Sequence, residues 1–452
     1  MFMQSVVQML SGAILPDHWA RFQLYAERIR IATATGKAMA EIHSSVWPFL
    51  AAKARGAPLM PRLRKFTAYY FGASGLSALS LLLPPTLRHL EILFDNEFDP
   101  EKLSRTPHVS ATLLQTLPQL VPDLEHFTWG VHLYLADAAY LQFFVHFKQL
   151  KSLSAPDNFP LNESNLRLVS SITSLQSLSC LIDLSGVTAP AFPPHAFQRL
   201  TSLALCGHSD HLVAFILACG FPNLEHTKFQ IVHPPSSGKP RHLSTALCQR
   251  LNPTLLTSFE ARYTHAFPMP PSSLMDYFEP LLAFPNVTSV DLAFLSTEPC
   301  IRDDDLARFG AAWPQLATFR IEHNKRYSQP QISRPTLPGL IALARRCPRL
   351  TTLYIPELDP SPMPEKSAIP ALGHGLRSVW IDSIVPPFTL QVCMDVATAV
   401  DRVFPCIDFA DPQILRYSVP GKSWVEVLRF VRAMRIGREN GVAYADMERQ
   451  ES

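Results

Sequence analysis

The sequence predicts an α/β solenoid, an array of short strand-and-helix units stacked side by side. Three observations lead to this prediction: a motif that recurs along the chain, helical stretches between its copies, and an unusual composition. The 452 residues include 41 prolines but only 17 glycines, and 17% are charged, against roughly 25% in typical globular proteins. Since 47% of the chain is hydrophobic, the prolines are expected between ordered elements rather than in disordered segments.

The recurring motif ends in a short amphipathic strand. It reads aromatic residue or Cys, Pro, any residue, Leu, two further residues, and then two apolar residues separated by one. The clearest copies lie at 221–229, 284–292, 313–321 and 347–355. The alternation of apolar and polar residues at the end of each copy predicts a strand with one buried face.

Looser copies extend the motif over most of the chain, with gaps of 24 to 37 residues between anchors. The thirteen anchor positions are 63, 87, 124, 150, 175, 200, 224, 256, 287, 316, 350, 376 and 407. This Leu-x-x-Leu-x-Leu pattern is the signature of leucine-rich repeats, whose units usually span about 20–29 residues. The longer gaps imply inserted loops. The sequence thus predicts a leucine-rich-repeat horseshoe with parallel strands on the concave side and helices on the convex side.

Helices are predicted between the strands, at 209–219, 272–284, 303–313 and 336–346. The first three begin with Ser or Asp, which cap helix N-termini, and Pro338 suits the first turn of the fourth. Each helix ends at the proline of the next motif. We divide the chain into an N-terminal helical cap or linker (1–58), about thirteen irregular repeats (59–411), and a C-terminal capping helix and tail (412–452).

Composition and charge exclude several classes of protein. Lysine and arginine number 40 against 38 acidic residues, a net charge of +2, so there is no basic excess for electrostatic nucleic-acid binding. The eight cysteines form no CxxC pair, which favours buried free thiols in a reducing compartment. Because no Lys or Arg precedes Arg21, we expect no signal peptide and an intracellular protein, cytoplasmic or nuclear.

Two further alternatives are set aside. The apolar stretch 66–87 contains two glycines and two prolines, which favours a strand and a buried helix over a membrane span. His208 and His211 are expected to be surface or capping residues rather than metal ligands, and the acids 303–305 are expected to stabilise a helix N-terminus. We find no catalytic triad, carboxylate dyad or metal motif, and so predict no enzymatic activity, cofactor or metal.

The concave surface is the remaining candidate site. Residues two, four and six positions after each anchor are predicted to point to solvent, and in the C-terminal half they mix both charge signs with aromatic residues that often dominate protein interfaces. The predicted partner-binding residues are His226, Lys228, Glu260, Arg262, Asp291, Arg320, Glu322, Tyr354, Trp380 and Asp382. Earlier strands present small residues such as Ser152, Ser177 and Ser202. We therefore expect a protein partner on the C-terminal half.

Segments near both ends resemble a known family. The residues are Leu15-Pro-Asp-His-Trp19, with Phe22 and Tyr25 following, the repeated Pro-x-Leu strands, and Ser423-Trp-Val-Glu-Val-Leu-Arg-Phe430. Together they resemble the fungal (basidiomycete-type) F-box proteins with degenerate leucine-rich repeats. This resemblance implies a substrate-recognition subunit of an SCF-type (cullin-RING) ubiquitin ligase, in which an F-box binds the ligase adaptor and the repeats hold the substrate.

The chain departs from this family near its start. Leu15-Pro16-Asp17 resembles the opening of an F-box, but Trp19 and Arg21 resemble the linker that follows one, and only 14 residues precede Leu15. We interpret 1–58 as an F-box remnant or a post-F-box segment and assign no adaptor-contact residues. Adaptor and cullin are expected partners only if an F-box is present. The alternative is a leucine-rich-repeat scaffold or regulator with no link to ubiquitin.

Overall fold

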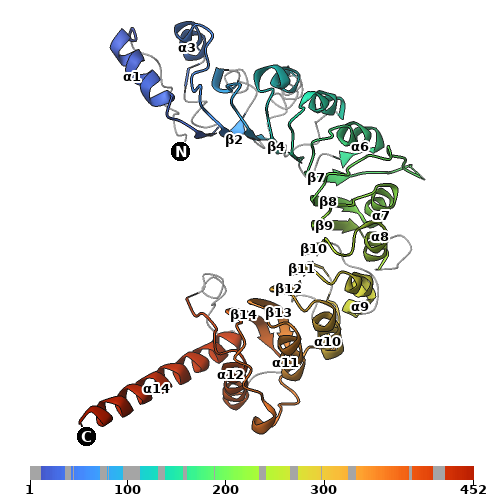
Figure 1. Ribbon diagram of the computed structural model, residues 1–452, viewed down its shortest axis with the longest axis vertical. Coiled ribbons are helices and arrows are strands. Elements are labelled where there is room, and N and C mark those ends of the chain that lie inside the picture. Colours follow the sequence, from blue (N-terminus) through green and yellow to red (C-terminus); the bar gives the residue numbers. More distant parts are fainter. Residues whose placement is uncertain are drawn as a thin grey trace, which may run out of the picture. The chain divides into compact units, whose positions relative to one another are not determined.

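The computed structural model describes most of the chain. The described residues are 12–35, 42–43, 45–71, 79, 81–94, 112–130, 138–155, 160–187, 189–233, 241–264, 273–296, 298–323, 332–385, 389–410 and 423–451. Two compact units divide it: an N-terminal unit of residues 1–207 and 214–223, and a C-terminal unit of residues 208–213 and 224–452. In each unit, strands form one layer and helices the other (Figure 1).

The N-terminal unit carries a parallel sheet in the order β1-β2-β3-β4-β5-β7-β8, with β6 paired to β7. Its strands are β1 (Ile31–Thr35), β2 (Lys65–Phe71), β3 (His89–Phe94), β4 (His126–Gly130), β5 (Ser152–Ser154), β6 (Pro160–Leu161), β7 (Ser177–Ile182) and β8 (Ser202–His208). Its helices are α1 (Pro16–Ala26), α3 (Val46–Ala54), the 3₁₀ helix η1 (Ala138–His146) and α6 (Glu163–Ser170). Helix α7 (Ser209–Ala218) contributes residues to both units.

The C-terminal unit carries six parallel strands in sequence order. They are β9 (His226–His233), β10 (Ser258–Tyr263), β11 (Ser289–Phe294), β12 (Thr318–His323), β13 (Thr352–Leu358) and β14 (Ser378–Ile384). The helices are α8 (His242–Arg250), α9 (Leu274–Phe278) with the 3₁₀ helix η2 (Glu279–Ala283), α10 (Asp303–Ala312), α11 (Leu337–Arg346), the 3₁₀ turn η4 (Lys366–Ala368), α12 (Leu390–Val403) and α14 (Ser423–Glu451).

The repeat motif explains this regularity. All thirteen anchors are buried, at most 4% exposed, and twelve of them are followed two residues later by the first residue of a strand. Backbone hydrogen bonds link each anchor segment to the next: Thr257 and Ser258 donate to the Glu225 carbonyl, and Thr288 and Ser289 donate to that of Thr257. Successive strands are thereby held in the same register, and the predicted α/β solenoid is confirmed.

The structure differs from the predicted pattern at both ends. The thirteenth anchor, Ile407, is followed by turns rather than a strand. Strand β1 lies inside segment 1–58, which was predicted to be helical. Its core-side positions are occupied by Ala32 and Ala34, whereas later strands carry larger apolar residues there, so the strand pattern is weak in the sequence. The boundary near 411 falls outside the described residues, so the three-part division stays a prediction.

Local sequence accounts for the helix ends. The predicted helix 272–284 is split into α9 and η2, since Pro280 cannot continue an α-helix. Helices α7, α10 and α11 begin and end within a residue or two of the predicted bounds. The last three residues of β13, Pro356–Leu358, are buried. None of the described helices is both long enough and apolar enough to cross a bilayer.

Helices α12 and α14 close the C-terminal unit. Trp424 is fully buried, and its indole Nε1 donates to the Val379 carbonyl of β14 at 3.2 Å. Ser423 Oγ accepts a hydrogen bond from the Ile384 amide at 2.9 Å. Further along α14, Arg435 donates to Asp401 of α12 at 3.0 Å. These contacts satisfy polar groups at the last strand while covering its apolar side.

Candidate functional site

Most of the predicted site residues lie on one surface, the side of β9–β14 that faces away from helices α8–α12 (Figure 1). We call it the strand face. Because every strand pair is in register, residues at the same distance from their anchors form rows across the sheet. The middle row runs through opposed pairs in the order Lys228, Glu260, Asp291, Arg320, Tyr354 and Trp380. The structure thus brings six of the ten predicted residues into one line.

The other four flank this row. His226, on the row before it, is exposed and lies in the row of hydroxyl residues Ser258 and Ser289. Arg262 and Glu322 lie on the following row, separated by Ala293. Asp382 is two residues beyond Trp380 and accepts a hydrogen bond from its indole Nε1 at 2.8 Å.

Charged side chains of the middle row pair across neighbouring strands. Lys228 Nζ lies 2.7 Å from Glu260 Oε1, and Arg320 Nε lies 4.0 Å from Asp291 Oδ1. The Arg320 guanidinium also pairs with Glu322. Two carboxylates, Glu260 and Asp291, are directly opposite each other at the centre of the row, an arrangement that destabilises a sheet unless cations flank it.

The two carboxylates are therefore held between a cation on each side. Burial raises the pKa of Asp291, and the Arg320 charge opposes this shift, while Glu260 and Glu322 add to it. The Arg262 charge also lowers the pKa of Asp291, by less than that of Arg320. Arg262 is exposed, and no ion pair of its guanidinium is formed with the described residues. The strand face therefore combines a row of paired charges with the exposed guanidinium of Arg262.

The two aromatic residues of the row correct the sequence prediction, which placed them in solvent. Trp380 and Tyr354 are only 3% and 7% exposed. The Arg320 guanidinium lies 5.0 Å from the centre of the Tyr354 ring, and burial, followed by the charge of Asp382, raises the pKa of Tyr354. The aromatic end of the row is therefore buried, and the accessible part of the row consists of charged residues on β9–β12.

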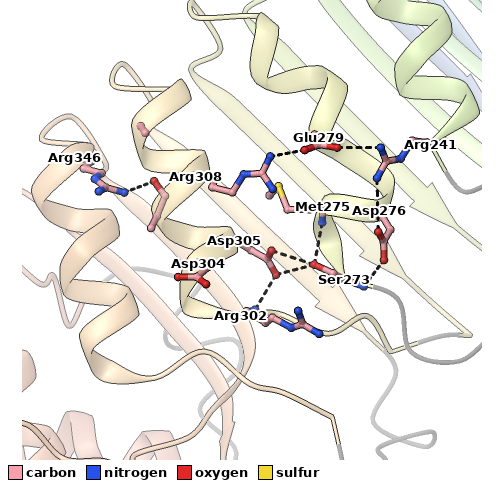
Figure 2. Close-up of a pocket in the computed structure, with 12 residues that line it drawn as sticks. Arg241, Ser273, Met275, Asp276, Glu279, Arg302, Asp304, Asp305, Arg308 and Arg346 are labelled. Carbon is pink, nitrogen blue, oxygen red and sulfur yellow. Dashed lines mark hydrogen bonds and ion pairs between the residues drawn. The ribbon is translucent and has the colours of Figure 1, made fainter.

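A groove of about 560 Å³ lies on the opposite side of the C-terminal unit, between helices of successive repeats (Figure 2). It is lined by both charge signs, and most of them are paired. Glu279 accepts from Arg241 at 2.9 Å and from Arg308 at 2.6 Å, and the bond from Arg308 is the main cause of the lowered pKa of Glu279. These ion pairs connect α8, η2 and α10 across three repeats.

The acid at the centre of Figure 2, Asp305, caps helices. It accepts a hydrogen bond from the Ser273 hydroxyl at 3.0 Å and from the Arg302 amide at 2.9 Å, while burial raises its pKa. Ser273 in turn accepts from the Met275 amide at the start of α9. The groove residues include neither histidine, lysine nor cysteine, so the Ser273 hydroxyl has a carboxylate and no imidazole beside it. The groove residues fasten the helices together.

A buried cluster at the carboxyl ends of β11–β13 was missed by the sequence reasoning. Glu298, His323 and Glu357 bring potential ligand atoms within 4.8 Å of one another. Arg334 lies between the acids, 2.5 Å from Glu357 and 3.9 Å from Glu298. Its guanidinium already supplies a positive charge to both carboxylates, so we assign no metal to this cluster. The residues come from four separate segments, and no spacing rule connects them.

His208 and His211, set aside in the sequence analysis, are joined by a third histidine. The His208 ring stacks on that of His233 at 4.0 Å between centroids and lies 5.2 Å from that of His211. A similar stack joins His89 and His126 on β3 and β4 at 4.2 Å, where the two residues are register partners. Only the His89–His126 stack follows directly from the strand register.

No protein-family model and no curated protein sequence matches the chain. Among solved structures, an internalin from Listeria monocytogenes is similar at 13% identity, covering 81% of this chain and 89% of that chain, with a TM-score of 0.32. A chain of the Rad7 and Elc1 complex in yeast is similar at 14% identity, covering 70% and 92%, with a TM-score of 0.31.

A third similar structure is the TLR13–ssRNA13 complex, at 12% identity, covering 82% of this chain and 61% of that chain, with a TM-score of 0.30. Similarity at this level concerns the fold alone. The chain's own repeat motif, its buried anchors and its all-parallel register define it as a leucine-rich-repeat solenoid.

Proposed function

We propose that this chain is a non-catalytic protein-interaction protein that holds a protein partner on the strand face of its C-terminal unit. The observation that carries the proposal is the row of charged residues across β9–β12, anchored at one end by the buried Tyr354. A rigid sheet holds these side chains at fixed spacing, which lowers the entropy cost of ordering them on binding. Complementary charges then select the partner and set its orientation.

The finer proposal is that the chain is a substrate-recognition subunit of an SCF-type (cullin-RING) ubiquitin ligase. Its support is the resemblance of Leu15-Pro16-Asp17 and of the segment after Ser423 to F-box proteins with degenerate leucine-rich repeats. Under this proposal the protein on the strand face is a substrate, and adaptor and cullin bind elsewhere on the receptor. The alternative, a scaffold or regulator without a ubiquitin link, keeps the strand face as the binding surface.

Charge reversal on the strand face tests the binding surface. Lys228 and Arg262 are both exposed, and K228E/R262E is expected to weaken partner binding at least tenfold. Because K228E sets a third carboxylate beside Glu260 and Asp291, circular dichroism checks that the variant is as folded as the control. The matched control, R345E/R349E, makes the same charge change at exposed positions on α11 and the turn after it. Tagged full-length chains are purified from the native cells, and bound proteins are quantified by mass spectrometry.

The outcomes separate the proposals. A partner that is recovered with the wild type and the control, but lost with K228E/R262E, supports binding on the strand face. Equal recovery with all three chains rules that surface out. Adaptor and cullin in every purification support the ligase role. Their absence from all three purifications, with the partner still recovered with the wild type and the control, supports the scaffold alternative.

A further inference from the structure

Basic side chains gather on the N-terminal unit, where strands β2 to β5 begin. Lys65, His89 and His126 are the first residues of β2, β3 and β4, and the strand register places them directly opposite one another. The residue immediately before each of these strands, and before β5, is also charged, and three of these four residues are basic. We define the basic patch as Arg64, Lys65, Arg88, His89, His126 and Lys151.

The register sets like charges side by side. Neighbouring strands of a sheet are about 4.8 Å apart, and the row from Lys65 through His89 to His126 contains no acid. The two imidazole rings are stacked, with centroids 4.2 Å apart and planes at 3° to each other. Like charges directly opposite each other destabilise a sheet. The row therefore destabilises the sheet whenever the imidazoles are protonated and no anion lies beside them.

The acids within the patch neutralise only its inner cations. Glu125 lies 2.6 Å from Lys151 Nζ and 3.7 Å from Arg88 Nε. Asp123 also pairs with Arg88, at 3.0 Å. These two acids are thus already engaged by Arg88 and Lys151.

The outer cations, Arg64 and Lys65, have no such partner. Both are exposed, and neither forms an ion pair with any of the described residues. Glu91 lies on the same face, one row further along the strands and opposite Thr67, whose hydroxyl donates to it at 3.4 Å. The patch therefore keeps an excess of positive charge at the beginning of β2.

We propose that the basic patch binds an acidic segment of a protein partner, with its carboxylates lying along the strand starts from Lys65 to Lys151. Three strand spacings cover about 14 Å, which is the length of about four extended residues. The argument for this occupant is charge complementarity. A nucleic acid is a poorer complement, because Asp123 and Glu125 lie among the cations and repel a continuous phosphate backbone. The patch is a second interaction surface, separate from the strand face of β9–β14.

The histidine stack makes this binding depend on pH. Burial lowers the pKa of both His89 and His126, and at both rings the charge of Glu125 opposes the shift. The charged groups around the stack are Lys65, Arg88, Glu91, Glu125 and Lys151. An acidic segment beside the rings favours their protonated forms, so that binding takes up protons. The affinity is therefore expected to rise as the pH falls from about 8 to about 6.

Fluorescence anisotropy of the full-length chain with a labelled peptide of eight aspartates tests the proposal. Aspartate, with a pKa of about 3.9, stays ionised over the whole pH range used. The wild type is expected to bind this peptide at about 50 mM salt and not to bind a peptide of eight asparagines. R64E/K65E reverses the two unpaired cations and is expected to raise the Kd at least tenfold.

The matched control, R345E/R349E, makes the same charge change at exposed positions of the C-terminal unit and should leave the Kd unchanged. K228E/R262E on the strand face should leave it unchanged as well. Circular dichroism confirms that each variant is folded. The proposal is overturned by a wild-type chain that shows no saturable binding below about 1 mM peptide. It is also overturned by a Kd that R64E/K65E does not change.

Two further measurements test the role of the stack and the class of the partner. The wild-type Kd should fall at least threefold from about pH 8 to about pH 6, and H89Q/H126Q should remove this dependence. An equal pH effect in H89Q/H126Q overturns the role assigned to the stack. A labelled strand of twelve thymidine nucleotides is the competing ligand. If it binds more tightly than the aspartate peptide at the same salt concentration, and R64E/K65E abolishes that binding, the patch is a nucleic-acid surface and the proposal is wrong.

Discussion

The terminal strands of the two units differ in how much of each is covered by helices. Strand β14 is covered by α12 and α14, which bury Trp424, Val427 and Val431 completely. Among the described residues, none of the five residues of β1 is buried, and α1 buries Ala26 alone. A solenoid needs a cap at each end because its terminal repeat has no neighbour to cover it. The difference indicates that α12 and α14 cap the C-terminal unit, whereas the described part of α1 adds little to the core of the N-terminal unit.

Removing α14 is the most severe way to test this comparison. A chain ending at residue 422 loses Trp424, Val427 and Val431 from the core beside β14, and each large apolar side chain lost from a core costs about 2–5 kcal/mol. We expect aggregation, or loss of a cooperative urea transition followed by circular dichroism. A soluble truncated chain that unfolds as cooperatively as the wild type would show that α14 is not a cap.

Substituting one tryptophan at each end sharpens the comparison. Trp424→Ala removes a fully buried ring that donates to the Val379 carbonyl, and should destabilise the C-terminal unit by about 3–5 kcal/mol. Trp19→Ala on α1, where only Ala26 is buried, should cost less than about 1 kcal/mol. Urea unfolding of both variants measures the difference, and equal losses would contradict it.

The sequence predicted most of the fold because one physical pattern recurs. Each anchor leucine with its two following apolar residues has to face the helices, so the strand positions and their common register follow from spacing alone. The row from Lys228 through Asp291 to Trp380 was predictable for the same reason. Strand β1 was not, because its core-side residues are Ala32 and Ala34, which carry too little hydrophobic signal.

Features that depend on contacts between repeats were not predictable. Tyr354 and Trp380 have the spacing of solvent-facing residues, yet Arg320 stacks on the Tyr354 ring and Asp382 bonds to the indole of Trp380. Arg334 and its carboxylate partners likewise come from segments of unequal length. A periodic pattern specifies which face a residue occupies, but not which neighbours cover it.

A buried ion pair provides a smaller and pH-dependent test of the C-terminal cap. Burial alone would raise the pKa of Asp401, but hydrogen bonds from Arg438 and Arg435 outweigh it and lower the pKa. Because the folded-state pKa lies below the unfolded one, the stabilisation is present above the unfolded pKa and is lost as pH falls through the folded pKa. Asp401→Asn should cost about 3 kcal/mol at neutral pH.

The measurement is native-state hydrogen exchange of α12 amides at neutral and acidic pH. The difference between wild type and Asp401→Asn should shrink as the pH falls below the ordinary range of aspartate pKa values. The matched control, Asp17→Asn in the exposed first turn of α1, should change stability by no more than about 0.5 kcal/mol. A difference for Asp401→Asn that is constant with pH would mean that its carboxylate charge is not what holds the cap.

The smallest expected effect is on strand β1. Ile31→Ala should change the stability of the monomer by less than about 0.5 kcal/mol, because the side chain is 68% exposed. Ile381→Ala, which removes a fully buried side chain of the capped strand β14, should cost about 2–5 kcal/mol. Both are measured by urea unfolding of the full-length chain. A large loss for Ile31→Ala would mean that its side chain is covered, and that the two ends are more alike than their exposure indicates.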